Sequence, residues 1–154
     1  MKSHTRLLAI DPGKVRLGLA ISDAERRLAS PLTTYTRRNP VQDARFFKKV
    51  IADEEVGAII IGLPVREDGY EGEQAKAARK FGDWLQKVVG LPCMFYDERL
   101  TTFEAESSLL EAGLTKKKRK ARRDRVAAQI LLQTFLDAGC RMESTANKDR
   151  DSNV

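Results

Sequence analysis

Three acidic residues occupy positions from which their side chains could do chemistry together. Asp11 follows the apolar run of residues 7–10, Glu98 follows the run of residues 93–96, and Asp124 precedes an apolar stripe near the C-terminus. In open α/β sheets, functional sites form beyond the carboxyl ends of the strands. Asp11 and the adjacent pair Asp97–Glu98 could therefore converge if their strands run in the same direction. Carboxylates suit acid–base work and the binding of hard metal ions.

Each acid also has an ordinary structural interpretation. Asp11 could be a turn residue ahead of a Pro-Gly pair, because aspartate is common in turns. Glu98 could form an ion pair with the adjacent Arg99. Asp124 could be an early-helix acid that the helix dipole favours. Taken one at a time, the three positions leave both interpretations open.

Two spacings indicate which acids could face a common site. Asp97 and Glu98 point to opposite faces if their strand continues to its end, so only one of them can face Asp11. In the last predicted helix, an acid shares one face with an apolar stripe: Asp124, Ala128, Leu131 and Phe135. An acid on the apolar face of a helix points toward the sheet rather than toward solvent.

Other catalytic residue types are scarce in this chain. His4 is the only histidine and lies close to the N-terminus, so histidine-based catalysis is nearly excluded. Cys93 and Cys140 are 47 positions apart with no second Cys or His nearby, which is not the spacing of a zinc site. We expect both to be free thiols. Hydrolytic chemistry here would therefore use carboxylates, a metal ion, or both.

Convergent carboxylates repel one another unless a cation lies between them. Mg²⁺ and Mn²⁺ prefer oxygen ligands and often bind through few carboxylates together with a substrate phosphate. Two such ions about 4 Å apart can activate water and stabilise the leaving oxygen in phosphodiester hydrolysis. The acids therefore suggest metal-dependent cleavage of a phosphodiester.

The positive charge of the chain is concentrated in one segment. The net charge is +6 over 154 residues, and residues 116–125 hold eight basic residues and one acid. That segment contributes +7, so the rest of the chain carries −1. A localised basic patch is typical of a protein that binds phosphates at one place.

Hydrophobic patterning predicts the elements that must position these residues. Strands are expected at residues 6–10, 17–22, 31–36, 58–64 and 92–99. Helices are expected at 41–54, 72–89, 101–113 and 121–139. This order indicates one α/β domain with a mixed five-stranded sheet, in which the first three strands form an antiparallel meander and helices cover both faces.

The ends of the chain bound the domain. We expect the domain to span residues 1–140 and the polar residues 141–154 to be a disordered tail.

No apolar stretch reaches the roughly 20 residues of a membrane span. The N-terminal segment has no secretory signal pattern, so we expect a cytoplasmic protein with no membrane contact.

Four segments of the chain resemble, in order, those of a known family. They are "LLAIDPGKVRLGLAISD", "IIIGLPVREDGYEGEQAKAARKF", "FYDERLTTFEAE" and "KKKRKARRDRVAAQILLQTFL". Together they are similar to the YqgF family, the bacterial Holliday-junction-resolvase-like proteins also described as pre-16S rRNA nucleases. The resemblance covers roughly residues 5–138. It implies an RNase H-like fold with the last two strands parallel to the first.

The resemblance also implies a two-metal nuclease that uses Mg²⁺ or Mn²⁺. Carried over by position, the catalytic and metal-binding residues are Asp11, Glu98 and Asp124, with Asp97 as the reserve metal ligand. Asp11 would bridge the two ions. The implied partner is precursor rRNA or branched DNA, and the protein is expected to be a monomer or a homodimer. Nucleic-acid contacts are expected from Lys14, Arg99, Lys116, Lys117, Lys118, Arg119, Lys120, Arg122 and Arg123. Arg99 could instead orient Glu98.

The sequence leaves four functions to compare. The first is a nuclease of structured RNA, most simply in pre-16S rRNA processing. The second is a Holliday junction resolvase, which needs two coordinated cuts and hence a two-fold dimer. A non-catalytic RNA-binding module would not need the acids. The Asp-x-Gly hairpin also resembles the phosphate loop of actin-like kinases, but those enclose their nucleotide with two RNase H-like halves, and 154 residues supply only one.

Overall fold

The structure is a computed structural model that describes residues 5–13, 15–100 and 115–139. Within the last range, the side chains of residues 116, 117 and 119–122 are not described. The predicted helix at 101–113, the predicted tail at 141–154 and Lys14 lie outside the described residues.

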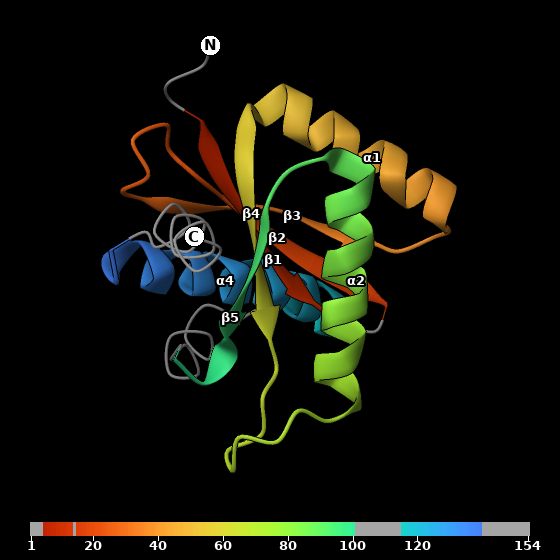
Figure 1. Ribbon diagram of the computed structural model, residues 1–154, viewed down its shortest axis with the longest axis vertical. Helices are drawn as coiled ribbons and strands as arrows, with labels where there is room; N and C mark the ends of the chain where they lie inside the picture. The colour runs from red at the N-terminus through yellow and green to blue at the C-terminus, as the bar shows by residue number, and fades with distance from the viewer. Residues whose placement is uncertain (1–4, 14, 101–114, 140–154) are drawn as a thin grey trace, which may run out of the picture.

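Five strands form one mixed sheet in the order β3-β2-β1-β4-β5 (Figure 1). Their bounds are β1 Arg6–Pro12, β2 Arg16–Ser22, β3 Ala29–Thr36, β4 Val56–Leu63 and β5 Cys93–Asp97. The pairs β1–β2 and β2–β3 are antiparallel, whereas β1–β4 and β4–β5 are parallel. The predicted meander and parallel pairs are therefore confirmed. Strands β1, β3, β4 and β5 all run the same way, so their carboxyl ends share one edge of the sheet.

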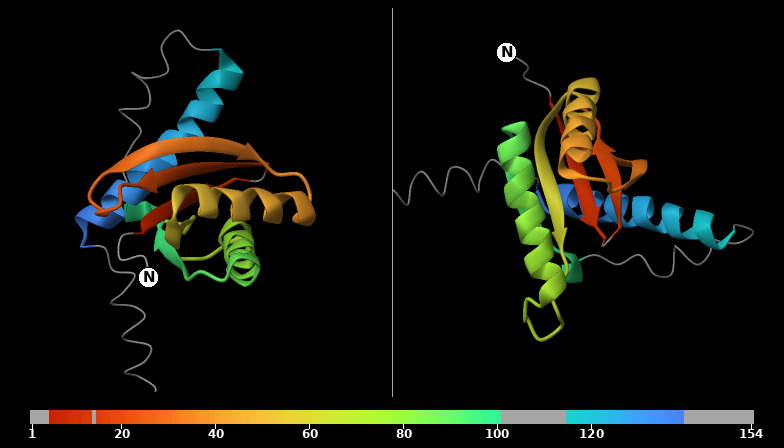
Figure 2. Two further views of the ribbon diagram at one scale, coloured as in Figure 1. Left: turned by 90° about the horizontal axis from the view of Figure 1, so that it is seen from above. Right: turned by 90° about the vertical axis from the view of Figure 1, so that its right-hand side faces the viewer.

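Helices cover both faces of this sheet. On one face lie α1 (Pro40–Glu54) and α2 (Glu73–Val89), and on the other lies α4 (Lys116–Asp137), as Figure 2 shows. A short 3-10 helix, η1 (Glu98–Leu100), follows β5. Among the described residues, no helix is long and apolar enough to cross a membrane.

The two faces have separate hydrophobic cores because side chains alternate along each strand. In β1, Leu7 and Ala9 pack with the α4 residues Leu131 and Phe135. The intervening Leu8 and Ile10 pack on the other face, with Phe47 of α1 and Phe81 of α2 in the same cluster. Strand β4 is apolar throughout since both of its faces are covered. This alternation also decides toward which helix each acid at a strand end points.

Local signals account for the helix boundaries. Helix α1 begins after Asn39, whose side chain accepts a hydrogen bond from the Gln42 amide, and Pro40 occupies its first position. Helix α2 ends at Gly90, which has a left-handed backbone with φ of 70°. Helix α4 starts at residue 116, five residues before the predicted start, because Thr115 caps it and lysine and arginine are good helix formers.

Candidate active site

Asp11 lies near the end of β1 on the face that α4 covers. It is two residues beyond Ala9, whose side chain lies in the α4-facing core, and it pairs with Gly18 of β2. Its side chain keeps some exposure, yet burial raises the pKa of its carboxyl well above the ordinary value. A hydrogen bond with Glu98 and the charges of Glu98 and Asp124 raise this pKa further. The structure therefore brings Asp11 close to both other predicted acids.

Glu98, not Asp97, is the acid that reaches Asp11 from β5. Glu98 begins η1 immediately after the strand, and its carboxyl lies against the backbone of Gly62 in β4. A Cβ atom at Gly62 would collide with the Glu98 carboxyl oxygen. Gly62 has the same strand parity as Ile60, which lies in the α4-facing core, so Glu98 lies on the same face as Asp11.

Asp97 lies on the opposite face of the sheet. It pairs with Leu63 of β4 and has the same strand parity as Phe95, which packs on the α1–α2 side. Its carboxylate accepts hydrogen bonds from the Arg99 guanidinium at 2.6 and 2.9 Å. These bonds hold the pKa of Asp97 below the ordinary value. Asp97, the reserve candidate, therefore points away from Asp11.

Asp124 comes to the site on the third turn of α4. Its main chain lies against Gly18, where a Cβ atom would collide with the Asp124 carbonyl oxygen. Its carboxylate Oδ2 lies 3.7 Å from Nε of Arg16 at the start of β2. The acid therefore lies over the sheet, as its helical spacing predicts. A glycine is needed at position 18 because the main chain of α4 packs so closely there.

The acids fit a hard divalent cation by the chemistry of their donors. All are carboxylates, the ligands that Mg²⁺ and Mn²⁺ prefer. The hydrogen bond between the Asp11 and Glu98 carboxyls requires a proton, and metal binding replaces such a proton. Across the described ranges, no three His, Cys, Asp or Glu side chains already form a complete metal-binding group. The structure thus supplies a close pair of carboxyls with Asp124 beside it.

A cleft of about 480 Å³ opens beside the Asp11–Glu98 pair. The turn after β1, the end of β4 and the first half of α2 line it, with Arg37 on its wall. Arg37 follows β3, and its guanidinium lies over the Phe81 ring at 5.1 Å from the centroid. Sequence reasoning missed Arg37 as a site residue. The sequence feature that could have identified Arg37 is its place in a basic pair directly after a predicted strand of the meander.

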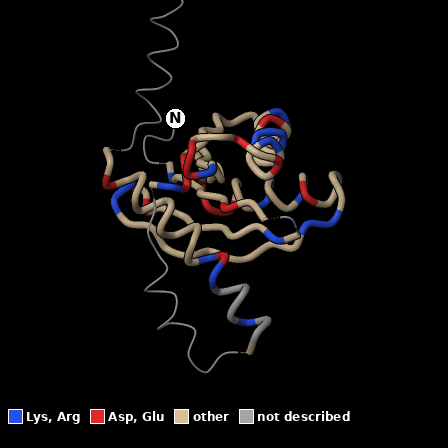
Figure 3. The backbone as a smooth tube through the Cα atoms, turned by 90° about the horizontal axis from the view of Figure 1, so that it is seen from below, with Lys and Arg blue, Asp and Glu red and all other residues tan. Residues whose placement is uncertain are grey.

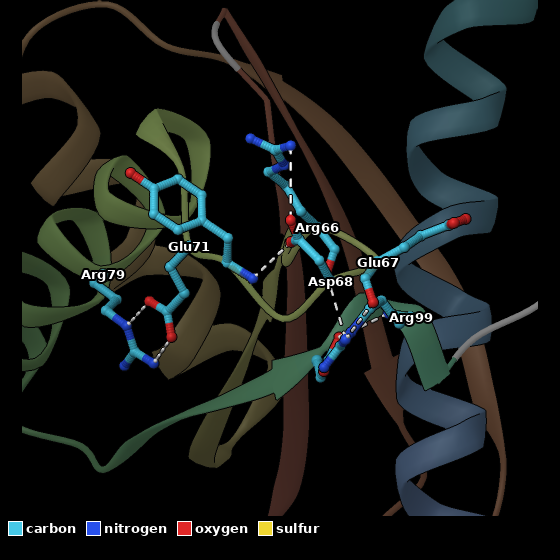
Figure 4. A network of polar contacts seen from close by, with 8 residues as sticks. Arg66, Glu67, Asp68, Glu71, Arg79 and Arg99 are labelled. Atoms are coloured by element: carbon cyan, nitrogen blue, oxygen red, sulfur yellow. Dashed lines mark hydrogen bonds and ion pairs between the residues drawn. The ribbon is translucent and has the colours of Figure 1, made fainter.

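Arg99 ties the end of β5 to the loop between β4 and α2 (Figure 4). Besides binding Asp97, its Nη1 donates to the carbonyl oxygens of Arg66 and Glu67 at 3.3 Å each. In that loop, the Tyr70 amide donates to the Asp68 side chain, so Asp68 acts as a turn residue. The donors of Arg99 are engaged within the protein, which favours its orienting role over a phosphate contact.

The basic segment forms the first turns of α4. Several residues of this segment are predicted to contact nucleic acid. Among these, the structure describes the side chains of Lys118 and Arg123, and both are exposed. Asp124 follows them directly, so this segment leads into the site. The remaining basic side chains predicted to bind phosphate in this segment are not described, and their role stays a prediction.

Comparisons with known proteins find a matching family and similar sequences. The family model RuvX, described as Holliday junction resolvase, matches residues 5–138. A protein of Rhodopirellula baltica named "Putative pre-16S rRNA nuclease" is 43% identical over 136 residues, covering 88% of this chain and 78% of its own length. A protein of the same name from Anaeromyxobacter sp. (strain K) is 41% identical over 132 residues, covering 86% and 96%.

A solved structure shares the fold. T. thermophilus RuvC in complex with a Holliday junction substrate superposes with a TM-score of 0.52 at 14% identity, covering 88% of this chain and 97% of that one. The fold is therefore RNase H-like, as the motifs imply. From the match over nearly all of the domain and from relatives above 40% identity, the chain belongs to the RuvX family of nucleases, the YqgF family of the sequence motifs.

Proposed function

We propose that this protein is a metal-dependent nuclease that hydrolyses phosphodiester bonds of structured RNA, with precursor 16S rRNA as its substrate in the cytoplasm. The observation that carries the proposal is the carboxyl pair of Asp11 and Glu98 at the cleft, with the charge of Asp124 beside it. The names of the relatives that share 40% or more of its sequence support the choice of substrate.

In this proposal Asp11 and Glu98 would hold Mg²⁺ or Mn²⁺, with Asp124 as a further ligand. When bound, such ions lower the pKa of water and stabilise negative charge on phosphate oxygens. Burial of Asp11 strengthens its attraction for a cation, because charges interact more strongly away from water. Arg37 on the cleft wall binds a substrate phosphate, and Arg99 keeps the end of β5 fixed so that Glu98 stays beside Asp11.

The first prediction concerns Asp11. Replacing Asp11 by Asn keeps the size of the side chain but removes the anionic ligand, so we expect cleavage to fall by at least about 100-fold while the fold and nucleic-acid binding persist. Cleavage of a precursor 16S rRNA fragment is measured with Mg²⁺ and with Mn²⁺, and circular dichroism checks the fold.

The matched control is Asp83→Asn, which makes the same change at an exposed position of α2 and should leave cleavage unchanged. Addition of a chelator should abolish cleavage by the wild-type protein. If an Asp11→Asn protein free of contaminating nuclease cuts as fast as wild type, the assignment of the site is wrong. If the wild-type protein binds the RNA but does not cleave it, a non-catalytic RNA-binding module becomes the better interpretation.

A second candidate function is Holliday junction resolution. The description of the family model and the shared fold with RuvC favour testing it. Resolution requires two symmetric cuts, so it predicts a two-fold dimer. A four-way DNA junction is therefore run beside the RNA fragment, and the mass of the protein in solution is measured. Paired cuts by a dimer support the resolvase; cleavage of the RNA alone, by a monomer, excludes it.

A further inference from the structure

A second hollow lies where the end of β3 meets α1. It has a volume of about 310 Å³, and its lining residues are Tyr35, Arg38, Gln42, Arg45, Phe46 and Lys49. We call it the α1–β3 hollow. Three of the six lining residues are cations and none is an acid, although Lys49 also pairs with Asp53 at 2.9 Å. Its volume is at the lower end of that of small-ligand pockets.

The hollow has an aromatic wall. The rings of Tyr35 and Phe46 are stacked, with centroids 3.8 Å apart and planes 11° from parallel, and both side chains are partly exposed. Each ring also makes an edge contact with the fully buried Phe47. The pair is thus anchored to the core but still reaches the surface. In proteins that bind single-stranded nucleic acids, aromatic rings stack against the bases and neighbouring arginines add to the binding.

A buried carboxylate holds these groups in place. Asp43 is 3% exposed, and its Oδ1 accepts hydrogen bonds from the Tyr35 hydroxyl at 2.6 Å and from the Arg38 amide at 3.0 Å. Its Oδ2 lies 3.6 Å from Nε of Arg37. Burial, followed by the bond to Asp43, raises the pKa of Tyr35 to about 12, so this hydroxyl stays a donor at neutral pH. The hollow is therefore preorganised, which lowers the cost of binding.

The α1–β3 hollow adjoins the catalytic cleft at the same edge of the sheet. Arg37 lines the cleft, while the next residue, Arg38, lines the hollow. The Arg37 amide donates to the Val15 carbonyl at 2.9 Å, which ties this segment to the turn after β1. Figure 3 shows basic positions in the segment between β3 and α1, close to the β1–β2 turn. A cationic path therefore leads from Asp11 to α1.

We propose that the α1–β3 hollow binds the single-stranded segment of the RNA substrate that leaves the catalytic cleft. Arg38, Arg45 and Lys49 contact its phosphates, and a base stacks against the exposed part of the Tyr35–Phe46 pair. This inference rests on the proposed nuclease function and deepens it. It identifies the substrate as a structured RNA with a single-stranded extension. Stacking accepts any base, so little sequence preference is expected.

The test measures binding separately from cleavage. Fluorescence anisotropy with the Asp11→Asn protein compares an RNA hairpin that has a blunt end with the same hairpin carrying a single-stranded extension of eight nucleotides, at each end in turn. We expect one of the extensions to lower Kd roughly tenfold, since each stacked base contributes measurably to affinity. No gain from either extension would overturn the proposal.

Reversing the charge of two α1 cations then tests whether the gain in affinity comes from the α1–β3 hollow. Arg45→Glu with Lys49→Glu should reduce the ratio of the two Kd values, blunt over extended, to less than twofold. The matched control, Lys80→Glu with Lys87→Glu on exposed positions of α2, makes the same change in charge and should keep the tenfold ratio. Equal losses in the two double variants would mean a general charge effect and would overturn the proposal. Competition by blunt duplex RNA as strong as by single strands would also overturn it.

These outcomes separate the inference from the proposed function. If the wild-type protein cleaves nothing but binding still depends on the extension and on the α1 cations, the nuclease proposal fails and the hollow stands. If the protein cleaves RNA but the Kd values for the blunt and extended hairpins are equal, the α1–β3 hollow is not part of the RNA interface. Arg45 and Lys49 are exposed, so their replacement should not prevent folding; circular dichroism checks this.

Discussion

At the residue scale, two neighbouring acids at the end of β5 lie on opposite faces of the sheet. Glu98 shares a hydrogen bond with partly buried Asp11, whereas Asp97 binds Arg99 on the other face. Asp97 ends β5 and follows the alternation of that strand, whereas Glu98 begins η1 and its carboxyl lies against Gly62 of β4. Chemistry at this site therefore depends on which face a side chain takes, and not only on how many acids a motif contains.

The second prediction tests this division. Glu98→Gln should reduce cleavage by at least about 100-fold, because it removes a carboxylate from the Asp11–Glu98 pair. Asp97→Asn should reduce it only about tenfold, as expected for a residue that positions others. Apparent metal affinity is measured for both. A larger loss in Asp97→Asn than in Glu98→Gln would reverse the assignment of the two residues.

The third prediction concerns Cys93. Burial, with a smaller contribution from Asp83, raises the pKa of this thiol to about 12, so it stays protonated at neutral pH. In a Cys140→Ser background, its reaction with a disulfide reagent at pH 8 should be at least about 100-fold slower in the folded protein than in urea. Equal rates would show that Cys93 is accessible and ionised normally.

At the scale of elements, two glycines set how closely α4 and β5 approach the central strands. Gly18 gives room to the main chain of α4 at Asp124, and Gly62 gives room to the side chain of Glu98. The obstacle is rigid in the first case and a flexible side-chain end in the second. The same substitution should therefore have different consequences at the two positions.

The fourth prediction follows from that difference. Gly18→Ala should lower the free energy of unfolding by about 1–3 kcal/mol, because a helix must move. Gly62→Ala should cost less stability but should reduce cleavage, because it displaces the Glu98 carboxyl. Urea unfolding and cleavage are measured for both. Gly72→Ala is the control, since its Cβ would meet only a Tyr70 ring atom at 3.9 Å.

At the scale of the whole molecule, the groups that we propose to act in cleavage lie at one edge of the sheet. The ends of β1, β3 and β5 bring Asp11, Arg37 and Glu98 to this edge. The basic segment of α4 reaches it from one face and the α1–β3 hollow from the other. A polyanion lying across this edge would contact cations on both sides of the carboxylates.

The fifth prediction follows from that distribution of charge. Replacing Lys116, Lys117 and Lys118 by Ala should weaken nucleic-acid binding and reduce the dependence of log K on log salt by up to about 2–3, because fewer counterions are released. Binding is measured at several salt concentrations. An unchanged slope would remove this segment from the interface.

The sequence by itself determined the α/β class, the antiparallel meander and the candidate acids, because periodicity and strand-end position are local signals. The parallel directions of the last two strands were implied by the family resemblance. Tertiary structure decided the rest. It placed Glu98 rather than Asp97 beside Asp11, because β5 ends at Asp97 and the Glu98 carboxyl then lies against Gly62 of the neighbouring strand β4. It explained Gly18 through the packing of α4. It also brought Arg37 to the cleft, because contacts between residues distant in the chain depend on how the sheet is assembled.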